Sequence, residues 1–169
     1  NGDLANDLGN LCQRSLSMIQ SYFGGVMPKP EHFSDQDRTL LEQASGLHQP
    51  VIATVERQVL HETLALIWRV IADANRYVDG EKPWTVRKTD PARAGTVLYV
   101  LAETIRNVAL LVQPFMPESA GKILDQLMVP ADQRTFAFAG PRGQLRSGVQ
   151  LPKPAGIFPR FVEEEQGAA

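Results

Sequence analysis

The sequence has only one cysteine, Cys12, among its 169 residues. A single cysteine excludes an internal disulfide framework and a metal site built from cysteines alone, and it is typical of a reducing compartment. The start of the chain lacks the basic and apolar regions of a signal peptide. No apolar run reaches the roughly 18–20 residues of a membrane span, since Glu103, Arg106 and Asn107 interrupt the longest candidate, residues 96–116. We therefore expect a cytoplasmic domain without a membrane partner.

The sequence also lacks an excess of positive charge. Its 17 basic and 19 acidic residues give a formal net charge of −2, whereas a general nucleic-acid binder carries a strongly basic surface. DNA is therefore not an expected partner, and any contact with RNA would have to be local. One detail is compatible with such a contact: 12 of the 17 basic residues are arginines, which make planar bidentate contacts and stack on aromatic rings.

What the sequence does contain is a helical period of apolar residues. Its 43% apolar and 21% charged residues are typical of a globular domain. The period predicts helices over residues 4–23, 35–50, 60–80, 91–112 and 118–127, with Ser34 as the cap of the second helix and Pro50 as a kink or split within it. Residues 97–112 are apolar almost all round, which predicts a central buried helix.

Glycine and proline dominate the last part of the chain. No helical period survives after residue 130, which predicts an extended arm, with a short hairpin as one alternative, ending in the acidic residues 163–165. The predicted fold is all-α: a bundle of about five helices over residues 1–130 with an extended C-terminal arm over residues 131–169 of the same domain. Because the chain lacks an initial methionine and opens on a helical pattern, we expect it to be part of a longer protein.

Residues suited to catalysis are few. His32, His48 and His61 are too scattered to form a ligand set with Cys12, which instead fits the apolar stripe of the first helix. The pair Gly24-Gly25 follows a helix, where it acts as a cap, and does not form a phosphate loop in front of one. The sequence therefore favours binding over catalysis.

A polar row on the first helix is the first candidate binding feature. Asn6, Asn10 and Arg14 are spaced i, i+4, i+8, so an α-helix would present them on one face. Amide groups beside a guanidinium can read base edges and stack on bases. The alternative interpretation is an ordinary solvated face, which every exposed helix has.

Trp84 is the second candidate. It follows Pro83 in a connector just after the third predicted helix, where no apolar stripe accounts for it. A tryptophan held near the surface can stack on an unpaired base. The alternative is that the ring folds back onto the bundle as a lid. Trp68, in contrast, lies within the third predicted helix and is expected to pack in the core.

Three segments carry a resemblance to a known family. They are residues 1–14 (NGDLANDLGNLCQR), 74–84 (ANRYVDGEKPW) and 103–120 (ETIRNVALLVQPFMPESA), and residues 157–160 (IFPR) extend the match into the arm. In this order and spacing they resemble the anticodon-binding region of bacterial methionyl-tRNA synthetases, which are class I aminoacyl-tRNA synthetases. The synthetases for Val, Ile, Leu and Cys share the helical architecture, but Asn-x-x-x-Arg combined with Pro-Trp points to the methionine enzyme.

The resemblance implies a role for each matching residue. Asn10 and Arg14 would contact the anticodon, Trp84 would stack on its first base, a cytosine, and Pro83 would shape the connector. Asn6 is added from its spacing alone. The implied function is recognition of the CAU anticodon of methionine tRNA. We also expect phosphate contacts from the basic residues nearby in the sequence, which are Arg76, Lys82, Arg87 and Lys88.

The nucleotide-binding signatures of the class I catalytic domain are absent, as are its Rossmann domain and its zinc-binding insertion. We therefore expect no catalysis and no cofactor in this chain, with ATP and zinc belonging to a separate catalytic part of the ligase. The expected partners are methionine tRNA and that catalytic domain.

Two alternatives stay open: a helical protein-interaction module, and the anticodon-binding domain of a synthetase for Val, Ile, Leu or Cys. The interaction module predicts a buried Trp84 and internal hydrogen bonds for Asn10 and Arg14.

Overall fold

The computed structural model describes residues 4–158, with the side chains of residues 7–158. Within that range the chain forms a π-helix (Leu4–Gly9) and seven α-helices, α1 (Asn10–Phe23), α2 (Asp35–Gly46), α3 (His48–Glu56), α4 (Leu60–Glu81), α5 (Pro83–Val86), α6 (Pro91–Val112) and α7 (Pro117–Gln126). The same residues contain no strand, and one isolated antiparallel bridge joins Val26 to Gln150. The prediction of an all-α bundle is confirmed.

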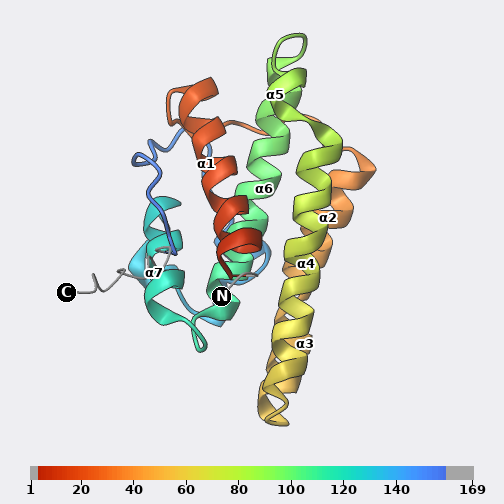
Figure 1. Ribbon diagram of the computed structural model, residues 1–169, viewed down its shortest axis with the longest axis vertical. Coiled ribbons are helices and arrows are strands. Elements are labelled where there is room, and N and C mark those ends of the chain that lie inside the picture. Colours follow the sequence, from red (N-terminus) through yellow and green to blue (C-terminus); the bar gives the residue numbers. More distant parts are fainter. Residues whose placement is uncertain (1–3, 159–169) are drawn as a thin grey trace, which may run out of the picture.

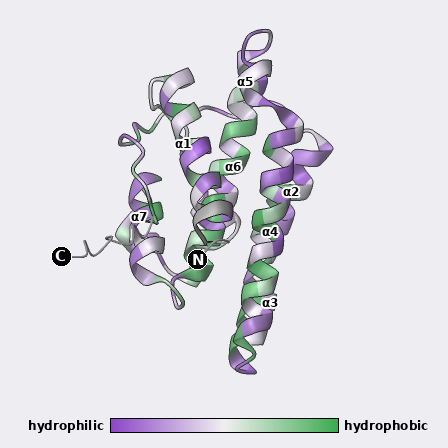
Figure 2. Ribbon diagram, in the orientation of Figure 1, coloured by the Kyte–Doolittle hydropathy of each residue, from purple (hydrophilic) through white to green (hydrophobic). Residues whose placement is uncertain are grey.

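Helix α6 is the centre of the bundle, as its composition predicts. It contacts α1, α2, α4, α5 and α7 and runs among them (Figure 1). Every residue from Ala94 to Val112 is buried. Figure 2 shows hydrophobic residues along it, whereas the outer helices carry both kinds. By length and composition α6 could cross a membrane, but its apolar stretch is buried in the molecule, as in the core helix of a globular protein.

The second predicted helix is divided in two. α2 begins after Ser34, whose hydroxyl accepts a hydrogen bond from the Asp37 N–H while the Asp37 carboxylate accepts one from the Ser34 N–H. α2 ends at Gly46, and α3 starts at His48. Pro50 therefore occupies the first turn of α3, where the helix needs no intrahelical partner for its missing N–H. This first-turn position turns the predicted kink into a helix boundary.

The first predicted helix also begins differently. Residues Leu4–Gly9 form a π-helix, and α-helical geometry starts only at Asn10. The i, i+4 rule that places Asn6 on the face of Asn10 holds for α-helices, so it does not extend across this junction. The side chain of Asn6 lies outside the described residues. α1 ends at Gly24, whose φ of 62° gives the left-handed cap that the glycine pair predicts.

The C-terminal arm packs on the bundle and does not fold into a hairpin of its own. It pairs with the segment that follows α1: the Met27 N–H donates to the Val149 carbonyl, and the Leu151 N–H donates to the Gly25 carbonyl. Leu151 and Ile157 are buried in the core. Pro159 and Arg160 of the IFPR segment, and the acidic residues 163–165, lie outside the described residues.

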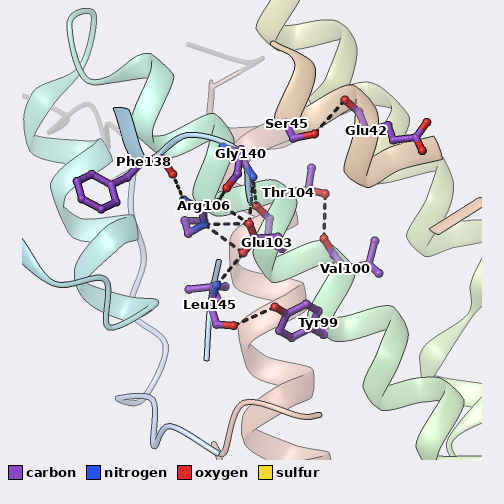
Figure 3. A network of polar contacts seen from close by, with 11 residues as sticks. Glu42, Ser45, Tyr99, Val100, Glu103, Thr104, Arg106, Phe138, Gly140 and Leu145 are labelled. Atoms are coloured by element: carbon purple, nitrogen blue, oxygen red, sulfur yellow. Dashed lines mark hydrogen bonds and ion pairs between the residues drawn. The ribbon is translucent and has the colours of Figure 1, made fainter. Parts of the chain in front are cut away.

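A buried polar cluster fastens the arm to α6 (Figure 3). Arg106, which is fully buried, donates to the carbonyls of Phe138 and Gly140 at 2.6 and 2.7 Å and pairs with Glu103. The second carboxylate oxygen of Glu103 accepts the Leu145 N–H at 3.0 Å. Each buried charge thus has partners on the arm, which satisfies the requirement for burying charge in a core.

Candidate nucleic-acid interface

Helix α1 presents two of the predicted site residues on one face. Asn10 is the first residue of α1 and is exposed, and Arg14 lies one turn later with 41% of its side chain exposed. Residues four apart on an α-helix are neighbours. Their amide and guanidinium groups therefore lie side by side on a face that solvent reaches.

Trp84 is placed by the junction between α4 and α5. Lys82, the residue that caps the C-terminal end of α4, adopts the left-handed conformation with φ 46° and ψ 58°. Pro83 is buried and forms the first position of α5, where its fixed φ suits a helix start. Trp84 follows within that single turn and is half-buried, with part of the ring packed against the core and part open to solvent.

Arg14 and Trp84, 70 positions apart in sequence, meet in the structure. The guanidinium carbon of Arg14 lies 5.6 Å from the centroid of the Trp84 ring, within the range of a cation–π contact. The same guanidinium donates to the Asp79 carboxylate at 2.8 Å, and that carboxylate is 62% exposed. The cluster joins α1, α4 and α5 on the surface.

A second cation–π pair joins α1 to the residue that follows α5. The guanidinium carbon of Arg87 lies 4.1 Å from the centroid of the Tyr22 ring, at the last turn of α1. Arg87 is one of the four cations that the sequence predicts as phosphate contacts, whereas Tyr22 and Asp79 are not among the predicted site residues. The i, i+8 spacing from Arg14 to Tyr22 was the available signal for the tyrosine.

A buried network supports the α4–α5 junction from below. Asp37 of α2, which is 0% exposed, accepts hydrogen bonds from the Tyr77 hydroxyl at 2.6 Å and from Arg93 at 2.9 Å. Arg93, in the first turn of α6, also donates to the Glu81 carboxylate at 2.6 Å. Glu81 is the last residue of α4, so the Arg93–Glu81 bond closes the loop that contains Trp84 and Arg87.

Hydrogen bonds stabilise the buried negative charge of Asp37 in this network. Burial alone would raise the pKa of Asp37, but the hydrogen bonds from Arg93, Tyr77 and the Ser34 N–H outweigh it and lower the pKa. Burial first, and the Asp37 carboxylate second, raise the pKa of Tyr77. The hydrogen bond to Asp37 raises the pKa of Arg93. Asp37 therefore stays ionised and Tyr77 stays a donor at neutral pH.

The remaining chemistry-bearing residues lie elsewhere. Cys12 is buried and free, as its place in the apolar stripe predicts, and burial raises the pKa of its thiol to about 12. Within residues 7–158 no three or more His, Cys, Asp or Glu side chains come together in a way that could hold a metal ion. A pocket of about 380 Å³ is lined by Met27, Leu127 and Leu145 among others, on the arm side of the molecule and away from Trp84.

Comparison with known proteins decides the family. The family model described as the anticodon binding domain of methionyl tRNA ligase matches residues 27–168. The chain belongs to that family. It is 52% identical to the methionine–tRNA ligase of Brucella suis biovar 1 over 98% of its own length and 32% of the relative's, and 48% identical to that of Mycobacterium tuberculosis over 95% and 31%.

Solved structures agree with the family assignment. The free-state methionyl-tRNA synthetase of Mycobacterium tuberculosis superposes with a TM-score of 0.91 at 46% identity, covering 96% of this chain and 33% of that one. The same enzyme bound by methionyl-adenylate gives a TM-score of 0.89 at 47% identity, covering 93% and 32%. The chain thus spans about a third of the length of the ligases that it matches.

Proposed function

We propose that this domain recognises the CAU anticodon of methionine tRNA through the surface formed by Asn10, Arg14 and Trp84. The observation that carries the proposal is the contact of Arg14 with Trp84, whose guanidinium carbon and ring centroid lie 5.6 Å apart, in a chain that matches the anticodon-binding family over residues 27–168. Specific RNA recognition targets unstacked loop bases, which stack on aromatic and guanidinium planes and present their edges to amides.

Each residue has a part that follows from its geometry. The open portion of the Trp84 ring is a stacking plane for the first anticodon base, and Pro83 fixes the turn that carries this plane. Arg14 and Asn10 face solvent beside it and supply donors and acceptors for base edges. Asp79 orients the Arg14 guanidinium through one N–H and leaves others for the RNA. Asn6 is a further candidate contact.

In the full-length ligase we expect the module to work with a catalytic domain that uses ATP to charge tRNA with methionine in the cytoplasm. Binding of the anticodon here would help to position the distant acceptor end in that domain. The signatures of ATP binding and the zinc-binding insertion belong to that other part, so this chain is proposed to contribute recognition only, with neither DNA nor a membrane as a partner.

The experiment is a titration with short RNA hairpins followed by tryptophan fluorescence. Trp68→Phe removes the second tryptophan, which is half-buried within α4, so that Trp84 is the only reporter. A hairpin with a CAU anticodon should quench the fluorescence saturably, and a hairpin with GAU in its place should bind at least tenfold more weakly. Salt must be fixed, because phosphate contacts depend on it.

Variants connect the signal to the site. Trp84→Ala should remove the preference for CAU, because base stacking is worth about 1–3 kcal/mol, and Arg14→Lys should weaken it, because lysine lacks the planar fork. Trp68→Phe alone, the matched control, should bind like the original chain when binding is measured by RNA anisotropy. Equal binding of both hairpins would contradict the proposal.

The interaction-module alternative predicts a buried Trp84 and internal hydrogen bonds for Asn10 and Arg14. Only the hydrogen bond from Arg14 to Asp79 agrees with it, since Trp84 is half-buried and Asn10 is exposed. If Trp84→Ala lowered the free energy of unfolding strongly while hairpin binding stayed unchanged, the ring would be a lid of the bundle and not a stacking plane.

A further inference from the structure

The cation–π pair formed by Arg87 and Tyr22 lies outside the set of residues to which the sequence motifs give a base-reading role. It rests on the last turn of α1 and on the residue that caps α5. We propose that Tyr22 holds Arg87 as a phosphate-binding arginine, which contacts the RNA backbone next to the base that stacks on Trp84. The proposal rests on the proposed function, because it takes the Trp84 plane as the position of that base.

Position is the first argument. Trp84 and Arg87 are three residues apart in one helical turn, and the Arg87 N–H donates to the Pro83 carbonyl at 3.1 Å. Residues at this spacing have Cβ atoms about 5–6 Å apart on the same face. A phosphodiester adjacent to a base on Trp84 is therefore within reach of the Arg87 side chain.

Three arginines around Trp84 are already paired with carboxylates. Of the four basic residues near Trp84 in sequence, Arg76 is paired with Asp73. Arg14 is paired with Asp79, and Arg93 with Asp37 and Glu81. Among the described residues Arg87 has no carboxylate within ion-pair distance and its guanidinium makes no hydrogen bond, although the residue is exposed. Its charge and its N–H donors remain available.

The Arg87 guanidinium is held in place before any ligand binds. The Tyr22 ring covers one face of the guanidinium, and the edge that carries the N–H donors stays free for a bidentate contact with phosphate. Lys82 and Lys88 are also exposed in this region, but neither is held against an aromatic ring among the described residues. An arginine already held in place loses less side-chain entropy on binding than a free lysine does.

The test measures hairpin affinity against salt concentration for matched variants of the 169-residue chain. Arg87→Gln should weaken binding of the CAU and GAU hairpins by the same factor, about three- to tenfold at low salt, and should reduce the slope of log affinity against log salt by about 0.7. The CAU preference should stay unchanged, because phosphates carry no sequence information. Lys88→Gln, the neighbouring control, should have a smaller effect on both quantities.

Tyrosine variants separate the charge from its positioning. Tyr22→Phe keeps the ring and should bind like the original chain. Tyr22→Leu keeps the Arg87 charge but removes the ring, so it should lower affinity while the salt slope is retained. Urea unfolding of each variant, monitored by circular dichroism, identifies any loss of affinity that follows from loss of folding.

A modified RNA gives the direct readout. Replacing the phosphate on one side, and separately on the other side, of the first anticodon base by a neutral methylphosphonate should weaken binding to the original chain at one of the two positions. The same replacement should have no effect with Arg87→Gln. Equal effects in both proteins at both positions, or an unchanged salt slope in Arg87→Gln, would overturn the proposal. If that slope falls while CAU and GAU bind equally, the phosphate contact stands and anticodon recognition fails.

Discussion

Two arginine–carboxylate pairs in this domain have the same chemistry and opposite surroundings. Arg106 and Glu103 are buried in the core, and they form hydrogen bonds with the arm at Phe138, Gly140 and Leu145. Arg14 and Asp79 are on the surface, and the Arg14 guanidinium faces an aromatic ring and solvent. The buried pair is closed to a ligand and holds the fold, whereas the exposed pair contributes little to the fold and keeps donors for a partner.

The largest expected effect is a loss of stability when the buried pair loses its arginine. Arg106→Met leaves the Glu103 carboxylate buried without its cation. It also removes the N–H groups that donate hydrogen bonds to the Phe138 and Gly140 carbonyls. We expect a loss of about 3–5 kcal/mol in the free energy of unfolding. Arg14→Met, which breaks an exposed pair, should cost less than about 1 kcal/mol. Urea unfolding followed by circular dichroism measures both, and equal losses would show that burial does not distinguish the two pairs.

A smaller effect is expected from the network beneath Trp84. Tyr77→Phe removes one donor to the buried Asp37 carboxylate and should lower the free energy of unfolding by about 1.5–3 kcal/mol. Because Arg93 still joins Asp37 to Glu81, the loop that contains Trp84 stays closed and the CAU preference should persist. Tyr99→Phe is the matched control for a lost hydroxyl at a distance from this loop, since Tyr99 donates to the Leu145 carbonyl.

The helices could be predicted well because the residues at a helix end determine that end through short-range backbone interactions. Ser34, the Gly24-Gly25 pair and Asp90-Pro91 each fix a helix end through their own backbone chemistry, and the structure places the ends at or next to these residues. Residues 4–23 are helical as predicted, but Leu4–Gly9 form a π-helix, a geometry that has no signature in apolar spacing.

The contacts that build the candidate interface are long-range, and a single sequence does not reveal them. No periodicity shows that Arg14 meets Asp79 and Trp84, or that Asp37 closes a network with Tyr77 and Arg93 while it also caps α2. Helical spacing predicts Asn10 and Arg14 as candidates and the connector predicts Trp84, while the family resemblance supplies their anticodon roles and adds Pro83; the structure brings Arg14 and Trp84 into contact. Tyr22 was missed because an aromatic residue in an apolar stripe is usually a core residue.

Acid should weaken the buried network around Asp37. The pKa of Asp37 is lower in the folded chain than its usual value of 3.8, so its contribution to stability is complete above that pH and is lost as the pH falls through the folded pKa. The free energy of unfolding should therefore fall more steeply below pH 3.8 for the original chain than for Asp37→Asn. Urea midpoints at several pH values measure this, and parallel curves would contradict it.

The smallest expected effect is a change in stability at Lys82, the strained residue that precedes Pro83 and Trp84 in the sequence. Lys82 has a φ of 46°, which costs a side chain with a Cβ about 1–2 kcal/mol. Glycine removes this cost but gains freedom in the unfolded chain, so Lys82→Gly should raise the free energy of unfolding by only about 0.5–1 kcal/mol. Lys82→Asn, which removes the same charge and tolerates the left-handed conformation, is the control for electrostatics. If the Asn variant keeps the fluorescence anisotropy of Trp84 while the Gly variant lowers it, the backbone of Lys82 is what holds the ring in place. If Lys82→Gly loses stability, the left-handed conformation is not a source of strain at this junction.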